Sequence, residues 1–306
     1  MKKTFLYFCL LFIVQTAFAA DSLYVREQQI PILIDRIDNV LYEMRIPAQK
    51  GDVLNEITIQ IGDNVDLSDI QAIRLFYSGV EAPSRKGEHF SPVTYISSHI
   101  PGNTRKALES YSVRQDEVTA PLSRTVKLTS KQPMLKGINY FWVSIQMKPE
   151  TSLLAKVATT MPNAQINNKP IDITWKGKVD ERHVGIGVRQ AGDDGSAAFR
   201  IPGLVTTNNG TLLGVYDIRY NSSVDLQEKI DIGVSRSTDK GQTWEPMRVA
   251  MTFKQTDGLP HGQNGVGDPS ILVDEKTNTI WVVAAWTHGM GNERAWWNSM
   301  PGMTPD

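Results

Sequence analysis

The sequence has almost no cysteine, no apolar run long enough to span a membrane, and no large excess of charge of either sign. Its 306 residues contain a single cysteine, Cys9. That cysteine lies in an apolar run near the N-terminus, so the rest of the chain can form neither disulfides nor thiolate–metal sites. An exported chain without such crosslinks must fold on a large core of its own.

The charge balance and the histidines exclude several classes of function. There are 32 lysines and arginines against 33 aspartates and glutamates, which favours neither a nucleic-acid partner nor a polybasic membrane contact. His183, His261 and His288 do not have the spacing of metal ligands. We therefore expect no metal and no cofactor, and the sequence leaves the oligomeric state open.

The first 19 residues have the pattern of a secretory signal peptide. Lys2 and Lys3 precede an apolar run at residues 5–14, and the small residues Ala17 and Ala19 follow it. The run is too short to cross a bilayer, so cleavage and export, to the periplasm or the outside, are expected. The alternative is an N-terminal anchor.

Most of the remaining chain predicts short β-strands, in an all-β fold. Every second residue is apolar at 57–61, 73–77 and 126–128, and residues 140–147 are rich in aromatic and β-branched side chains. Residues 20–178 are predicted to form a β-sandwich. Two short helices are possible, at 67–70 and 151–157.

Residues 179–306 have a different rhythm, typical of a β-propeller. Strands at 199–206, 211–219, 230–235 and 244–251 with short turns would form one four-stranded blade, and strands at 269–273 and 279–286 would begin a second. An isolated blade leaves apolar faces and strand edges uncovered. We therefore expect the chain to hold only the first part of a propeller.

An octapeptide at residues 237–244 is the most specific local pattern. Asp239 can accept hydrogen bonds from its own turn, Gly241 can adopt positive φ, and Trp244 can pack below, with Ser237 and Thr243 completing the motif. The predicted role is a structural turn, and the motif marks the architecture.

Four charged residues are candidates for a site because they lie at strand starts, at a strand end or in one loop: Arg200, Arg219, Asp225 and Asp268. Arg200, between two apolar residues, is either a solvated edge residue or a fixed cation for a carboxylate. Asp225 is either a solvated turn residue or a general acid whose pKa partial burial raises, with Glu228 as a competitor. We also expect Asp268 to occupy the place in its blade that Arg200 has in the first.

Three tryptophans near the end of the sequence are candidates for contacts with a sugar. Trp286, Trp296 and Trp297 offer faces that suit sugars and acetamido methyl groups, although packing explains each equally well.

Taken together, these motifs resemble bacterial exo-α-sialidases. The resemblance rests on Phe-Arg-Ile-Pro at 199–202, a second arginine at 219, Asp225 six residues later, the Asp-box at 237–244, and Asp-Pro at 268–269. It covers residues 185–306, and the first domain resembles the sandwich that precedes the propeller in some of these enzymes.

The resemblance implies a six-bladed propeller that removes terminal sialic acid from glycans with retention of configuration. Arg200 would bind the sugar carboxylate and Asp225 would be the acid/base. Arg219 and Asp268 would lie near the 4-hydroxyl, and Trp296 would line the acetamido pocket. The family's tyrosine nucleophile, an exception to the two-carboxylate scheme, cannot be assigned to a residue in this sequence, so we expect the chain alone to be inactive.

Two other functions remain open. One is a trans-sialidase or a related acid-sugar glycosidase. The other is a carbohydrate-binding protein or adhesin with no catalytic activity.

Overall fold

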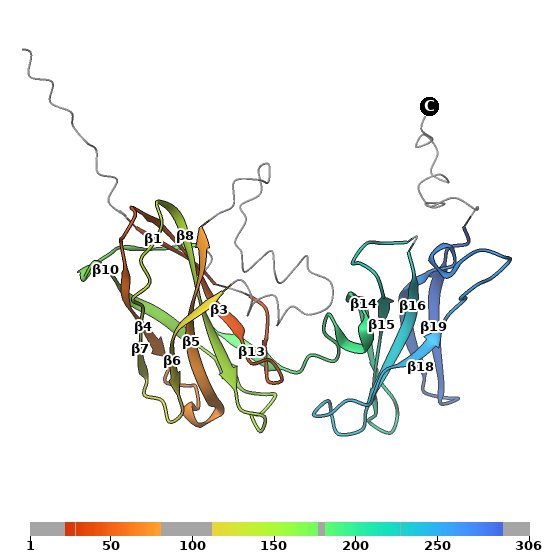
Figure 1. The fold of residues 1–306 in the computed structure, drawn as a ribbon. Coiled ribbons are helices and arrows are strands. Elements are labelled where there is room, and N and C mark those ends of the chain that lie inside the picture. The colour runs from red at the N-terminus through yellow and green to blue at the C-terminus, as the bar shows by residue number, and fades with distance from the viewer. Residues whose placement is uncertain (1–21, 28, 81–111, 177–180, 227, 290–306) are drawn as a thin grey trace, which may run out of the picture.

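The computed structural model describes residues 22–27, 29–80, 112–176, 181–226 and 228–289, and these are all-β apart from three short 3-10 turns. Figure 1 shows two groups of strands, one for each predicted part of the chain. The predicted signal peptide lies outside the described residues. No helix in the described ranges has the length and apolar character that a membrane crossing requires.

Two sheets packed face to face form the first part. A six-stranded sheet has the order β12-β1-β3-β8-β5-β6, and a four-stranded sheet has the order β11-β10-β4-β7. Their strands are β1 (Leu23–Glu27), β3 (Asn39–Ala48), β4 (Leu54–Ile61), β5 (Ile70–Val80), β6 (Val113–Thr119), β7 (Thr125–Thr129), β8 (Gly137–Met147), β10 (Thr159–Ile166), β11 (Lys169–Pro170) and β12 (Ile173–Lys176).

The core lies between these two sheets and confirms the period-two pattern. Alternate residues of β4, β5, β7 and β8 point into one cluster of buried apolar side chains, among them Ile57, Leu75, Leu128 and Phe141. The six-stranded sheet also buries side chains on its other face, where Phe76 stacks on Trp142 with ring centroids 4.1 Å apart.

The two expected helices have different outcomes. Residues Leu67–Asp69 form a 3-10 turn, η1, which Asp66 caps by accepting from the backbone N–H of Ser68. The other prediction, a helix at 151–157, is wrong. This segment is a loop ending in β9 (Lys156–Val157), because its backbone is needed to pair with β13 (Arg182–Gly185).

The connection between the two parts stays close to the sandwich. Strand β13 pairs with β9 and, in parallel, with β2 (Ile32–Leu33), so a small third sheet extends to residue 185. Beyond it, the Gln190 side-chain amide donates to Asp35 (2.6 Å) and accepts from Arg36 (3.3 Å). The predicted boundary at 178/179 falls beside residues 177–180, which lie outside the described part.

The second part is the start of a β-propeller, with one four-stranded sheet followed by a two-stranded one. All neighbouring strands in both sheets are antiparallel. The elements are η2 (Asp193–Gly195), β14 (Ala198–Thr206), β15 (Leu212–Arg219), β16 (Ile230–Ser237), β17 (Arg248–Met251), η3 (His261–Gln263), β18 (Val266–Asp274) and β19 (Thr279–Trp286). The fourth strand is shorter than predicted, because Trp244 belongs to the preceding turn.

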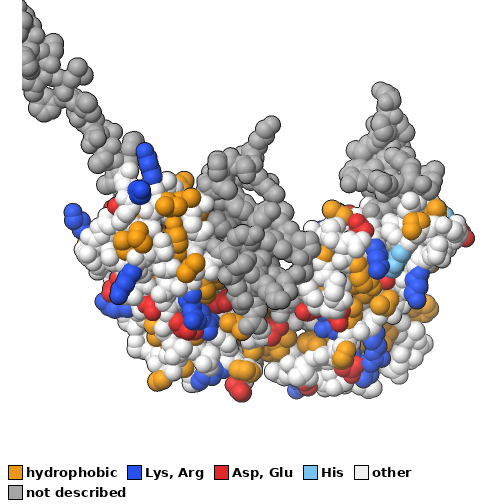
Figure 2. All heavy atoms as spheres, viewed as in Figure 1, with side chains coloured by type: hydrophobic (Ala, Val, Ile, Leu, Met, Phe, Trp, Pro, Cys, Tyr) orange, Lys and Arg blue, Asp and Glu red, His pale blue; other side chains and the backbone are white. Residues whose placement is uncertain are grey.

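The second sheet packs on the first and leaves much of its own apolar surface exposed. A Cβ on Gly203 would lie 3.1 Å from Val215 and 3.4 Å from Ile271, so the small residue permits the close approach of the two sheets. In contrast, Leu272, Trp281 and other large apolar side chains of β18 and β19 are exposed. Hydrophobic patches are visible on this part of the molecule in Figure 2.

Candidate active site

The predicted site residues gather at one end of the two sheets. Because β14 and β18 begin where β15 ends, the antiparallel arrangement brings Arg200, Arg219 and Asp268 to the same end, and the loop at 220–229 follows directly. Loops at strand ends on a rigid sheet are where reactive side chains are commonly held.

Two arginines hold the same two oxygen atoms of this loop. Nη1 of Arg200 donates to the carbonyl of Ser223 (3.0 Å) and to Oδ1 of Asp225 (2.9 Å). Nη1 of Arg219 donates to the same carbonyl (2.9 Å) and the same Oδ1 (2.7 Å). The Arg219 side chain is 2% exposed and that of Arg200 is 42% exposed, so one cation is part of the interior and the other faces solvent.

The Asp225 carboxylate is open to solvent and strongly attracted to cations. Its side chain is 76% exposed. The hydrogen bond from Arg219, supported by the charges of Arg219 and Arg200, lowers the pKa of Asp225 below its ordinary value. The expectation that partial burial raises this pKa is therefore wrong for the structure described. Here Asp225 is ionised and bridges two guanidinium groups.

A buried aspartate lies behind the two arginines. Asp217 is fully buried, and its Oδ2 accepts from Nε (3.1 Å) and Nη2 (2.7 Å) of Arg219. Its Oδ1 accepts from the backbone N–H of Asp268 on the next sheet (2.9 Å). Burial raises the pKa of Asp217, and the bonds from Arg219 and from the Asp268 backbone act in the opposite direction.

Asp268 does not occupy the place in its sheet that Arg200 has in the first. Both strands contain a bulge before the same proline position, with positive φ at Ile201 (52°) and Asp268 (55°). Asp268 therefore matches Ile201, and Arg200 matches Gly267. Ile201 is β-branched, and such residues rarely adopt positive φ. Backbone strain of this kind is common at functional sites. Asp268 is exposed beside the cluster, joined to it through its backbone.

A second polar cluster holds the β17–β18 loop beside the site. Asp231 accepts from the hydroxyl of Tyr220 (3.0 Å) and lies 2.7 Å from Nε2 of His261. Burial, reinforced by Asp231, raises the pKa of Tyr220, which opposes a role as a nucleophile. A Cβ on Gly265 would lie 2.4 Å from the carbonyl of Glu228, so this loop packs tightly on the Asp225 loop.

The Asp-box lies at the opposite end of the same sheet, in the turn after β16. The Ser237 hydroxyl donates to Asp239 (2.8 Å) and accepts from the N–H of Gly241 (2.8 Å). The backbone N–H of Thr243 also donates to Asp239 (2.9 Å), and Trp244 donates to the carbonyl of Gly241 (3.2 Å). The motif braces a turn at the far end of β16, whose eight residues at ~3.3 Å per step separate it by about 23 Å from the strand end near the arginines.

The remaining described candidates bond or stack on residues other than the two arginines. Trp286 stacks on Phe253 with centroids 4.4 Å apart. Trp296 and Trp297 lie outside the described residues. Glu228 accepts from the side chain of Asn221 (2.8 Å) and from the N–H of Lys229 (2.8 Å), so it serves its own loop.

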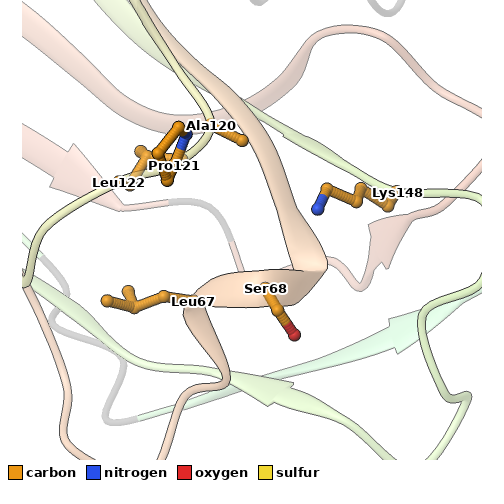
Figure 3. Close-up of a pocket in the computed structure, with 6 residues that line it drawn as sticks. All are labelled: Leu67, Ser68, Ala120, Pro121, Leu122 and Lys148. Atoms are coloured by element: carbon orange, nitrogen blue, oxygen red, sulfur yellow. The ribbon is translucent and has the colours of Figure 1, made fainter.

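A hollow in the sandwich is unrelated to this cluster. It is lined by Leu67, Ser68, Ala120, Pro121, Leu122 and Lys148, and Figure 3 shows that most of these side chains are apolar. None of the predicted site residues lines it. In the described ranges, no group of three or more histidines, cysteines or acidic residues could hold a metal ion.

Sequence reasoning located the arginines and Asp225 but missed the residue that connects them to the next sheet. Asp217 and Arg219 are two positions apart in a strand, so they share a face, and the strand is otherwise apolar. A buried charge in such a strand needs a partner of opposite sign. That signal was available in the sequence, but the backbone partner at Asp268 was not.

Comparison with known proteins agrees with this architecture. The profile of the N-terminal domain of BNR-repeat neuraminidase matches residues 20–170. A sialidase of Bacteroides fragilis (strain YCH46) is 56% identical over 309 residues, an alignment that covers 99% of this chain. The chain belongs to the sialidase family.

Solved structures support the fold of this sialidase-family chain. The Hadza microbial sialidase Hz136 is 60% identical, with a TM-score of 0.77 over 92% of this chain and 54% of that protein.

A further sequence relative matches a shorter stretch. Sialidase B of Streptococcus pneumoniae serotype 4 is 34% identical over 122 residues, 35% of this chain and 18% of that protein. The chain spans about half the length of the two relatives that match most of it, 56% of the B. fragilis sialidase and 54% of Hz136.

Proposed function

We propose that this chain supplies part of the active site of an exo-α-sialidase, an exported enzyme that releases terminal sialic acid from sialylated glycans. The observation that carries the proposal is the pair of arginines, one exposed and one buried, that hold the exposed carboxylate of Asp225 at 2.9 and 2.7 Å. Membership of the sialidase family supports the same function.

Arg200 is the group that receives the substrate carboxylate. Among the described residues, its hydrogen bonds use Nη1 alone, so Nε and Nη2 remain for a ligand. A guanidinium presents two parallel N–H groups with the geometry of a carboxylate, and this contact is stronger than a neutral hydrogen bond. Asp225 is bonded to Nη1 of the same guanidinium group, next to the edge that would receive the substrate.

Substrate binding then changes the chemistry of Asp225. When the sugar carboxylate binds Nε and Nη2 of Arg200, it neutralises one of the two cations beside Asp225 and adds a negative neighbour. Both changes raise the pKa of Asp225, because each disfavours its ionised form. Asp225 can thus donate its proton to the glycosidic oxygen while the bond between that oxygen and the anomeric carbon breaks, and later take a proton from attacking water.

The nucleophile of the reaction is a tyrosine, as sialidases use in place of a second carboxylate. A tyrosine avoids the repulsion between a carboxylate nucleophile and the carboxylate on the anomeric carbon. Of the described tyrosines near the site, Tyr216 and Tyr220 already bond Ser235 (2.6 Å) and Asp231 (3.0 Å). Neither is assigned this role, and configuration is retained through a tyrosine outside the described residues.

The substitution Asp225→Asn in the full-length gene product tests the proposal. We expect kcat on an alkyl-linked sialoside such as sialyllactose to fall by roughly 10²- to 10⁴-fold, the usual contribution of a general acid. Binding of free sialic acid is retained. Asp274→Asn is the matched control, because Asp274 is a partly exposed carboxylate at the other end of β18, where it bonds its own turn.

Three outcomes separate the candidate functions. A large loss of rate with binding kept supports the enzyme. Binding without turnover in the unaltered protein favours the adhesin. Transfer of the sugar to an added lactose acceptor, in preference to water, identifies a trans-sialidase.

A further inference from the structure

Asp217 joins the two sheets of the propeller at the candidate site. Its carboxylate is fully buried and uses both oxygens. Oδ2 accepts two hydrogen bonds from Arg219, at 3.1 and 2.7 Å, and Oδ1 accepts the backbone N–H of Asp268 at 2.9 Å. One side chain therefore fixes a guanidinium of the first sheet relative to the strained bulge of the second.

Arg219 extends this fixed position to the loop that carries Asp225. Its Nη1 donates to the carbonyls of Ser223 (2.9 Å) and Val224 (2.8 Å) as well as to the Asp225 carboxylate (2.7 Å). Three successive loop residues thus accept hydrogen bonds from one guanidinium group. Because Arg219 is almost completely buried, its charge requires a buried partner, and Asp217 is that partner.

We infer that Asp217 is a positioning residue, which couples the acid/base loop around Asp225 to Asp268 on the next sheet. The inference rests on the proposed sialidase function. Asp225 and Asp268 would otherwise belong to two separate sheets that can shift independently. Because Asp217 bonds both Arg219 and the Asp268 backbone, the proton donor Asp225 and the residue Asp268 keep a fixed relative position during the reaction.

An asparagine at 217 cannot replace both links. The amide has one oxygen and one NH2 group, whereas Asp217 faces N–H donors on both sides. Either the Arg219 contact or the Asp268 contact is lost. The substitution also removes the negative charge of residue 217. Among the described residues, Asp225 is then the carboxylate that still forms an ion pair with Arg219. Asp225 is then held more firmly as an anion and becomes a poorer proton donor.

The effect of Asp217 on the acid predicts a dependence on the leaving group. An alkyl alcohol needs protonation as it departs, whereas an activated phenol departs without it. A residue that acts through Asp225 must therefore matter more for alkyl-linked than for aryl sialosides. A residue that serves stability alone lowers both rates by the same factor, because it changes only the amount of folded enzyme.

The experiment compares Asp217→Asn with Asp231→Asn in the full-length gene product, using sialyllactose and an activated aryl sialoside. Asp231 is the matched control: a buried aspartate of the adjacent strand that bonds Tyr220 and His261. We expect Asp217→Asn to lower kcat on sialyllactose by about 10- to 100-fold, part of what a general acid supplies, and on the aryl sialoside by less than about threefold. The alkaline limb of the kcat profile for sialyllactose moves to lower pH.

Equal losses on both substrates with an unmoved pH profile would overturn the inference. If Asp217→Asn does not fold, Arg219→Lys gives the same test, because a lysine can reach Asp217 or the loop but not both. The variant Asp225→Asn, measured in parallel, distinguishes failure of the positioning role from failure of the proposed function. If Asp225→Asn shows the leaving-group dependence and Asp217→Asn does not, only the positioning role fails. If Asp225→Asn shows none, the proposed function itself fails.

Discussion

The sandwich and the first propeller sheets are both built mainly from antiparallel strands, and both bury some charged side chains, but different side chains fill their interiors. In the sandwich, a single large cluster of apolar residues from both sheets fills the interior. In the propeller sheets, the interior at the site end contains Asp217, Arg219 and Asp231. Apolar burial is non-directional, whereas buried charges require partners at defined angles and distances. The sandwich is therefore a stable support, and the first sheets specify a geometry.

The two parts also differ in how much apolar surface they expose. The sandwich covers most of its large apolar side chains on both sheets. The propeller sheets leave Leu204, Leu272, Trp281 and Val283 exposed. Exposed apolar strands of this kind are suited to contact with further sheets.

The largest expected effect that sharpens this comparison is Phe141→Ala in the sandwich core. Phe141 is 1% exposed and packs on Tyr77 with centroids 4.7 Å apart. The lost contacts and the cavity should lower the free energy of unfolding of the sandwich by about 3–5 kcal/mol. Urea denaturation of the 306-residue chain measures it. Leu272→Ala on the exposed strand β18 is the control, for which a change within about 0.5 kcal/mol is expected in this chain.

A smaller effect is expected for Ser237→Ala in the Asp-box turn. The buried hydroxyl bonds both Asp239 and the N–H of Gly241. Its removal leaves a buried N–H without that acceptor, which costs about 1–3 kcal/mol. This loss should appear in the unfolding of the propeller sheets and leave the sandwich transition unchanged. Equal shifts of both transitions would show that the two parts do not unfold separately.

The smallest expected effect is on the pH dependence of stability. Hydrogen bonds from Thr243, with others from its turn, lower the pKa of Asp239 from 3.8 to about 2. Because the folded pKa lies below the unfolded one, this stabilisation is present above pH 3.8 and is lost as the pH falls toward 2. Asp239→Asn should flatten that acid slope for the propeller sheets. An unchanged slope in thermal melts between these pH values would contradict it.

The strand pattern was predictable because it depends on local alternation. Every second residue of 57–61 and 73–77 is apolar, beginning with the first, and these side chains are buried in one cluster. The failed helix at 151–157 and the shortened strand before Met251 are different cases. There, pairing with β13 and the anchoring of Trp244 in its turn decided the conformation, and neither is visible in local sequence.

The sequence alone determined the class of fold, the family and the side chains available for chemistry, because these depend on residue type and spacing. Only the tertiary structure decided how those side chains are used. It placed Asp225 in the open between two cations, which lowers its pKa, and it matched Asp268 with Ile201. It also made Asp217 the link between the sheets. These outcomes depend on burial and on hydrogen bonds between strands that are distant in sequence.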